Sequence, residues 1–383
     1  MTSRDRISFA HLLRGIAALS VVLFHYLGIF WARPEGVASL LNAPVLAVPA
    51  PIAFLAAIFT PNDVFSVGHF GVALFFLISG FVIPFSFSRQ TRLGFFVARA
   101  WRLWPTYATG LTLTLLWLFA VTTVFGRAWP HAPQVLLWHY ALGVRDIAGS
   151  PSLDGIVWTL EIEIRFYLLC LLLAPALRSG RSLWPVAAAG TLIAGTAAVD
   201  VWWAGAPGAR GAWTIPAYIL GLDGQLIAYM LIGTFFNFHA RGRLTIGTLT
   251  ACTLAAGAGV TWLWSLGPIA AEFWPGVISY ATALAVFVAC YSARAHIRVW
   301  GPLAWLADVS YPLYVVHAIP GYAVMRLALE AGAPAGIALV AAFFTAFVSA
   351  TIIHRWVEGP TRELGRSWAR RLSTAGTDRQ PRV

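Results

Sequence analysis

Long runs of apolar residues dominate this chain, and short polar segments separate them. About 18–20 consecutive apolar residues mark a membrane-spanning helix. The runs are continuous, whereas a transmembrane β-barrel would show short segments of alternating hydrophobicity. The sequence therefore predicts an all-α polytopic membrane protein with about ten transmembrane helices. We place them near residues 8–30, 67–88, 104–125, 155–177, 183–203, 213–236, 244–265, 273–292, 302–328 and 335–357.

Another apolar stretch, residues 44–60, is interrupted by Pro44, Pro49 and Pro51. Because proline removes a backbone donor and breaks a helix, we interpret this stretch as an interfacial or re-entrant part of the first loop. The membrane region, residues 1–358, is expected to form one domain. Residues 359–383 are expected to form a basic cytoplasmic tail, with a surface helix followed by a disordered end.

The charge of the chain is strongly positive and unevenly distributed. Only 11% of the residues are charged, 59% are hydrophobic, and the net charge is +11, with arginine as the basic residue throughout. If the N-terminus is cytoplasmic, most arginines fall in the cytoplasmic loops and the tail, which satisfies the positive-inside rule with both termini cytoplasmic. This distribution explains the charge without nucleic acid as a partner. The cytoplasmic set includes Arg4, Arg6, Arg89, Arg92, Arg178, Arg241, Arg294, Arg379 and Arg382.

The first apolar run, residues 7–31, carries Arg14 and His25 inside the crossing. At about 100° per residue, eleven steps end only about 20° past three full turns, so both side chains share one stripe, roughly 16 Å apart. His11 falls on the same side. A guanidinium inside a membrane helix costs on the order of 2.5–3.5 kcal/mol on insertion scales. These groups are therefore expected to face a polar cavity between helices.

Each of these two side chains has a functional and a structural interpretation. A neutral His25 could act as a general base on a hydroxyl, or it could bond to a neighbouring helix. Arg14 could hold an anionic or carbonyl group, or it could form an internal salt bridge to Glu161 or Glu163. Their alignment on one stripe favours the functional interpretation.

The fourth crossing places Glu161 and Glu163 at a depth similar to that of His25. A carboxylate there could orient the imidazole or balance its charge. The two point in different directions, so one of them is expected to face His25, and we assign Glu163. The alternative for Glu161 is an ion pair with Arg165 at i+4.

Further polar residues lie at helix ends and inside the ninth crossing. Arg99 and Arg102, one turn apart, suit phosphate recognition, although lipid headgroups or topology would also explain them. The ninth crossing contains Pro312 and Pro320, which allow it to bend or break. For His317 in this crossing, a bond to another helix is favoured over a second catalytic role. The expected cavity-lining residues are His11, Ser79, Glu161, Asp308, Ser310 and His317.

Several of these segments, in order, resemble the integral-membrane acyltransferase family 3, whose members O-acylate polysaccharides, lipid-linked sugars, lipids and antibiotics. The similar blocks are LRGIAALSVVLFHY, GVALFFLISGFVI, RAWRLWP, VWTLEIEIRFYLL, SYPLYVVH and VEGP. The similarity covers most of the membrane region. His11 is a departure, since many members carry aspartate at this position.

The resemblance implies roles for individual residues. His25 and Arg14 correspond to the essential histidine and arginine of the family, and Glu163 corresponds to its glutamate. Arg99 and Arg102 correspond to its loop arginines. The donor would be acyl-CoA, most simply acetyl-CoA, with no metal ion. The acceptor would be a hydroxyl of a carbohydrate, lipid or glycolipid, and the location would be the inner (cytoplasmic) membrane of a bacterium.

The sequence thus predicts a membrane-embedded O-acyltransferase with His25, Arg14 and Glu163 as catalytic residues and Arg14, Arg99 and Arg102 as donor-binding residues. The alternative is a proton-coupled secondary transporter of a sugar or small molecule that uses His25 and Glu163. The sequence shows no paired inverted halves with matching broken helices, which many transporters have. The acceptor, the acyl chain and the oligomeric state do not follow from the sequence.

Overall fold

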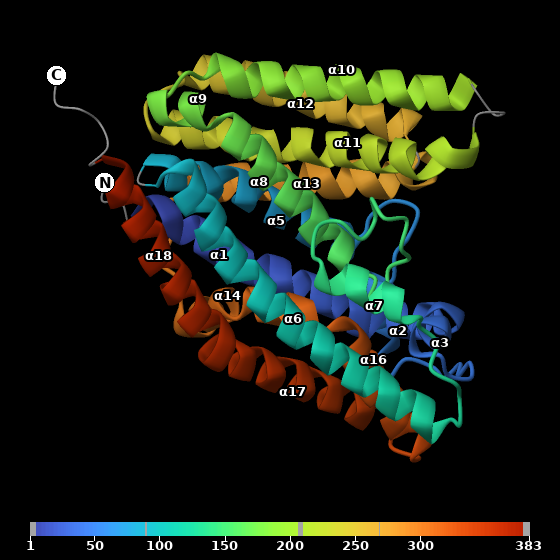
Figure 1. The fold of residues 1–383 in the computed structure, drawn as a ribbon. Helices are drawn as coiled ribbons and strands as arrows, with labels where there is room; N and C mark the ends of the chain where they lie inside the picture. Colours follow the sequence, from blue (N-terminus) through green and yellow to red (C-terminus); the bar gives the residue numbers. More distant parts are fainter. Residues whose placement is uncertain (1–4, 89, 206–209, 268, 378–383) are drawn as a thin grey trace.

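The computed structural model describes residues 5–88, 90–205, 210–267 and 269–377, and every regular element in these ranges is a helix (Figure 1). The predicted all-α class is confirmed. Arg4, Arg89, Arg379 and Arg382, which entered the charge argument, lie outside the described residues.

Within the described ranges, eight helical segments are long and apolar enough to cross a membrane, and a bent pair, Ser310–Val316 with Ala318–Glu330, makes nine. The remaining expected crossing, 155–177, contains the shorter α8, Val157–Leu172, with 16 residues. Pro175 lies in the first turn of the next helix, α9 (Ala174–Ser179), where the chain leaves the α8 axis. The eight segments are Ser8–Ala32, Val67–Ser88, Arg92–Val124, Leu183–Gly205, Pro216–Ala240, Ile246–Leu266, Ala270–Ser292 and Ala335–Ser373.

The helices form two groups with α8 running between them (Figure 1). On one side lie α10 (Leu183–Gly205), α11 (Arg210–Ala240), α12 (Ile246–Leu266) and α13 (Phe273–Ser292). The backbones of α5 (Val67–Val82) and α11 touch, since a methyl group added at Gly80 would lie 1.8 Å from the carbonyl oxygen of Met230. Small residues of this kind let membrane helices approach closely.

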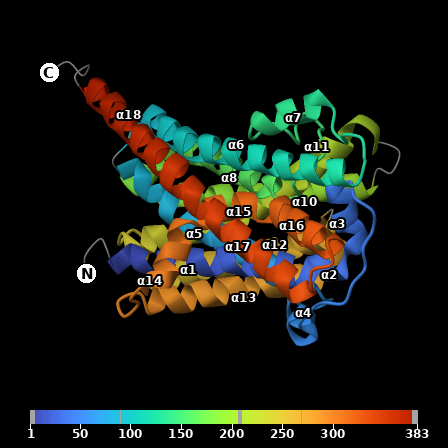
Figure 2. The same ribbon diagram turned by 90° about the horizontal axis from the view of Figure 1, so that it is seen from below.

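The other group contains α6, α17 and α18; in Figure 2 α18 continues the line of α17, and α18 packs along α6. Their bounds are Arg92–Val124, Ala335–Ile353 and Gly359–Thr377. A π-helical turn, His354–Glu358, joins α17 to α18, so the expected surface helix of the tail continues the last crossing and packs along α6. The described chain begins and ends at one end of the bundle, where α1 (Asp5–Leu23) starts and α18 stops (Figure 1).

The first helix is interrupted at the level of His25. The α-helix α1, Asp5–Leu23, passes into a π-helical turn, Phe24–Ile29, and then into the short α2, Phe30–Ala32. Single π-helical turns inside α-helices occur frequently at functional sites. After α3 (Pro34–Leu41), the proline-rich stretch 44–60 contains one seven-residue helix, α4 (Ala53–Phe59), whose end packs against Gly28 of the π-helical turn. The helical part of this stretch, seven residues long, is too short to span a bilayer.

The expected break in the ninth crossing is present. The chain forms α14 (Gly301–Asp308), α15 (Ser310–Val316) and α16 (Ala318–Glu330), and α15 meets α16 at 54°. Pro320 has no N–H to offer the carbonyl of Val316, so the α-helical ladder is interrupted beside His317. Tyr26 of the π-helical turn fills the bend, and its hydroxyl donates to the His317 carbonyl at 2.7 Å.

Candidate active site

The largest group of predicted site residues lines one cavity of about 910 Å³, counted out to its mouth. It lies between α1, α5 (Val67–Val82), α6, α8 and α15, toward the end of the bundle where α1 begins. We call it the arginine cavity. Its predicted members are His11, Arg14, Ser79, Arg99, Arg102, Glu163 and Ser310.

The arginines of this cavity are held differently. Arg99 donates to the Ser86 hydroxyl at 3.0 Å, and its guanidinium lies over the rings of Phe95 and Tyr167 at 5.3 and 5.4 Å. The Nε atom of Arg102 is buried and has no hydrogen-bond partner among the described residues. Arg99 is therefore fixed in place, whereas Arg102 keeps a donor available for a ligand.

Glu163 balances this positive charge. Its carboxylate accepts hydrogen bonds from Ser79 at 3.1 Å and from Tyr167 at 2.6 Å. It also interacts electrostatically with Arg14, Arg99 and Arg102. The expected contact with His25 is not formed, because these partners turn the carboxylate toward the arginines. This part of the sequence interpretation is corrected.

Glu358 is a second carboxylate near these arginines, behind the residues that line the cavity, and the sequence analysis did not assign it. It is 2% exposed, it interacts electrostatically with Arg102 and Arg14, and its Oε2 lies 2.8 Å from the Nδ1 of His354 across the π-helical turn. It belongs to the VEGP block. The sequence did contain a signal for Glu358, because it is an acidic residue at the end of an expected crossing in a chain with few acidic residues.

His25 lies beyond the wall of the arginine cavity, not in it. Its Nδ1 is hydrogen-bonded to the Tyr322 hydroxyl at 2.5 Å, and its ring is 4.7 Å from the ring of His317. Tyr314, which lines the cavity, lies 5.5 Å from the His317 ring. Two ring contacts therefore connect the cavity wall with His25, which is itself partly accessible.

The hydrogen bonds define the protonation pattern of His317. Its Nδ1 lies 2.7 Å from the carbonyl oxygen of Tyr314, which can only accept, so Nδ1 carries the proton. Nε2 is then an acceptor; it is fully buried and has no partner within the described ranges. The two imidazoles form one polar cluster at the bend of the ninth crossing.

Glu161 is not a cavity residue, contrary to the expectation. It is fully buried in a two-bond ion pair, accepting from Arg145 Nε at 3.0 Å and from Nη2 at 2.6 Å. Arg165, its expected partner, instead pairs with Asp146 and with Asp223, at 2.8 Å from the latter. Asp308 is about half exposed and lies 3.6 Å from the Nε2 of His11, outside the residues that line the cavity.

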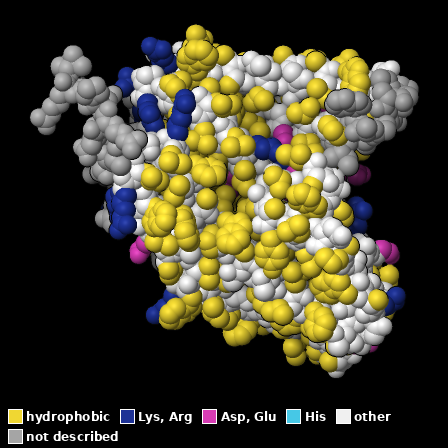
Figure 3. All heavy atoms as spheres, viewed as in Figure 1, with side chains coloured by type: hydrophobic (Ala, Val, Ile, Leu, Met, Phe, Trp, Pro, Cys, Tyr) yellow, Lys and Arg dark blue, Asp and Glu magenta, His cyan; other side chains and the backbone are white. Residues whose placement is uncertain are grey.

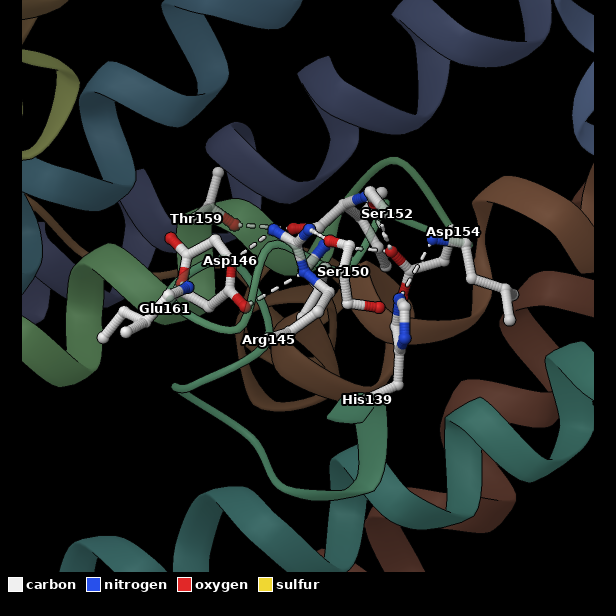
Figure 4. Close-up of polar contacts among 12 residues, drawn as sticks. His139, Arg145, Asp146, Ser150, Ser152, Asp154, Thr159 and Glu161 are labelled. Atoms are coloured by element: carbon white, nitrogen blue, oxygen red, sulfur yellow. Dashed lines mark hydrogen bonds and ion pairs between the residues drawn. The ribbon is translucent and has the colours of Figure 1, made fainter. Parts of the chain in front are cut away.

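The Arg145–Glu161 pair belongs to a buried network that anchors the start of α8 (Figure 4). Arg145 also donates to the Ser150 carbonyl at 2.6 Å, and Asp154 accepts from the backbone of Ile156 and Val157 at 3.0 and 3.1 Å. The sequence analysis missed this network, because most of its members lie in the irregular loop before α8 and share no motif or periodic spacing.

His139, from α7 (Pro133–Tyr140), completes the network (Figure 4). Its Nε2 accepts from the Leu153 N–H at 3.0 Å, which requires an unprotonated nitrogen, and burial lowers the pKa of this imidazole. Thr159, in the first turn of α8, is bonded to Tyr314 at 2.7 Å. The network therefore fixes the loop, the start of α8 and, through Thr159, the wall next to His317.

Comparison with known proteins identifies the family. The acyltransferase domain of family 3 matches residues 7–355, nearly the whole chain. The chain belongs to acyltransferase family 3. It is therefore a multi-pass membrane acyltransferase, as the sequence resemblance predicted, and it uses an acyl donor.

Two relatives of this family-3 acyltransferase come from rhizobia. It is 28% identical to the exopolysaccharide production protein ExoZ of Rhizobium meliloti (strain 1021) over 333 residues, which are 82% of this chain and 94% of the relative. It is 30% identical to nodulation protein 10 of Rhizobium leguminosarum bv. viciae over 151 residues, 34% of this chain and 38% of that protein. No solved structure matches the chain significantly.

Proposed function

We propose that this family-3 acyltransferase transfers an acyl group, most simply acetyl, from cytoplasmic acyl-CoA to a hydroxyl of a carbohydrate or lipid-linked glycan. In this proposal it resides in the inner membrane with both termini in the cytoplasm. The glycan acceptor is supported by the similarity to a protein of exopolysaccharide production. Arginine side chains gather at the edge of the molecule where α18 ends (Figure 3), which supports this orientation.

The observation that carries the proposal is the placement of Arg14, Arg99 and Arg102 around one cavity whose wall contacts the His25–His317 pair. Three guanidiniums line the cavity with one carboxylate, Glu163, and Glu358 lies behind the wall and also pairs with His354, so the cavity favours an anion. Arginine forks match phosphate oxygens in two-bond geometry. In this assignment Arg99 and Arg102 bind the CoA phosphates, and Arg14 polarises the thioester carbonyl.

His25 acts as the general base in this mechanism. The mechanism requires the neutral tautomer with its proton on Nδ1, the atom bonded to the Tyr322 hydroxyl, so that Nε2 can accept the proton of the acceptor hydroxyl. The oxygen then forms the new ester bond to the carbonyl carbon, the carbon–sulfur bond breaks, and CoA leaves as the thiolate, which takes up a proton. The role of Glu163 changes from orienting His25 to holding the arginines at fixed charge and position.

The test uses membranes that contain the full chain, incubated with radiolabelled acetyl-CoA. We expect His25→Ala to abolish acceptor-dependent CoA release and labelling of the acceptor, while the protein remains inserted in the membrane. His296→Ala is the matched control, because His296 is exposed in the loop before α14. Full activity of His25→Ala would overturn the assignment. If radiolabelled acetyl remained bound to the protein after the reaction was stopped with acid, this would indicate an acyl-imidazole intermediate instead of direct transfer.

A further inference from the structure

A second cavity, of about 1360 Å³ counted out to its mouth, lies on the opposite side of α8. Thr159, Leu160 and Glu163 of α8 line the arginine cavity, whereas Trp158, Ile162 and Arg165 line the second one. At about 100° per residue these two sets occupy opposite faces of the helix. The α8 helix is therefore a wall shared by both cavities.

The second cavity is located toward the other end of the bundle. His69 lies near the start of α5 and Trp264 near the end of α12, whereas Ser79 and Val82, near the end of α5, line the arginine cavity. In Figure 3 the face is hollowed below α10–α12, with basic and acidic side chains inside an otherwise hydrophobic surface. Given the proposed orientation, this cavity lies on the non-cytoplasmic side.

The charges that line the second cavity are paired and slightly acidic on balance. Arg165 is held between Asp146 and Asp223, and Glu272 lies 3.3 Å from the Nε2 of His69. Arg145, the other lining arginine, is already neutralised by Glu161. The cavity is thus lined by three carboxylates and by two arginines whose charges are already balanced in ion pairs. This balance disfavours a carboxylate or phosphate ligand.

Unused hydrogen-bonding groups line the same cavity. The indole N–H of Trp264, a residue only 2% exposed, and the hydroxyl of Ser150, 9% exposed, have no partner among the residues that the structure describes. A buried donor without a partner is unfavourable, so a ligand atom that accepts from it would be stabilised. Aromatic rings provide apolar faces beside these groups, from Trp158, Tyr218, Trp264 and Tyr280.

We propose that the second cavity binds the acceptor, and that the acceptor residue is an uncharged sugar. This inference rests on the proposed function, which it deepens by placing the acceptor on the other side of α8. Sugar hydroxyls both donate and accept, which suits paired arginines and carboxylates, and the C–H faces of the ring suit aromatic side chains. The second cavity also lies near His25. Phe24, the neighbour of His25 in the chain, packs on Gly68, and Gly68 is the neighbour of His69, which lines the cavity.

The experiment measures sugar binding directly, without acetyl-CoA. The full chain in lipid nanodiscs is titrated with methyl β-D-glucopyranoside or methyl β-D-glucuronide, and binding is followed by saturation-transfer NMR. We expect the glucoside to bind more tightly than the glucuronide. Trp264→Phe removes one neutral hydrogen bond and should weaken glucoside binding by about 2- to 10-fold. Trp262→Phe, on the exposed side of the same helix, should leave it unchanged.

A second variant tests the charge argument. Asp223→Asn removes one lining carboxylate with little change in shape, so the preference for glucoside over glucuronide should become smaller. The inference is overturned if wild-type protein does not bind the glucoside, if it binds the glucuronide more tightly, or if Trp264→Phe binds as Trp262→Phe does. Acetyl-CoA binding is measured separately: its failure would remove the proposed function, while the sugar titration would still decide the location of the sugar site.

Discussion

At the residue scale, the two arginines of α6 have different freedom although they lie one turn apart. Arg99 is fixed by Ser86 and two rings, whereas Arg102 has a buried donor without a partner within the described chain. Sequence spacing could predict that both reach the same cavity, because residues i and i+3 share a helix face. It could not predict which of them is free, since the fixing groups come from α5–α6 and α8.

Arg102→Gln tests this difference. Loss of a charge-assisted hydrogen bond to phosphate should raise the KM for acetyl-CoA by about 10- to 100-fold. Arg92→Gln, an exposed arginine on the same helix, is the control and should leave the KM unchanged. Steady-state kinetics over a range of acetyl-CoA concentrations measures both. An unchanged KM for acetyl-CoA in Arg102→Gln would show that Arg102 does not bind the donor.

Tyr322→Phe tests the orientation of His25. The substitution keeps the ring and removes the hydroxyl that is bonded to Nδ1. We expect kcat to fall by about 2- to 10-fold, the effect of one neutral hydrogen bond, with the KM for acetyl-CoA unchanged. A larger KM with constant kcat would assign Tyr322 to donor binding instead.

The sequence predicted the members of the arginine cavity better than their partners. Arg14, Arg99, Arg102, Glu163 and Ser79 meet in one cavity as expected. The prediction that Glu163 contacts His25 was wrong. The depth of a residue in the membrane can be predicted from the sequence, but the direction of its side chain cannot. The pairing of Glu161 with Arg145 depends on the fold of a loop that has no periodic pattern.

At the element scale, close helix contacts depend on single glycines. The expected helices were read from hydrophobic runs, and these agree with the structure except for α8, which Pro175 limits to 16 residues before α9. The bend between α15 and α16 was anticipated from Pro312 and Pro320 and is present. The approach of α5 to α11 at Gly80 was not anticipated, because a glycine in an apolar run has no visible partner in the sequence.

Gly80→Ala should destabilise the bundle. The added methyl group would overlap the backbone of Met230, and such overpacking costs about 1–3 kcal/mol. Gly190→Ala, in α10 with open space around the position, is the control and should gain about 0.5–1 kcal/mol from helix propensity. Thermal unfolding of both variants in the same detergent measures the difference. Equal Tm values for the two would contradict the close contact.

At the scale of the whole molecule, the uneven charge predicts an orientation. Alkaline phosphatase fused after α18 should be inactive, and green fluorescent protein at the same place should be fluorescent, because both termini are expected in the cytoplasm. A phosphatase fusion in the loop between α6 and α7 is the internal control and should be active. The opposite pattern would reverse the assignment of the two cavities to the two sides of the membrane.

The short α8 has a consequence for permeability. Because α8 separates the two cavities, the thioester and the sugar cannot react through it, since the attacking hydroxyl must touch the thioester carbon. The two substrates can meet only beside this helix. Bound substrates would fill that opening, so that an acyl group can leave the cell's interior while protons, CoA and small ions are retained.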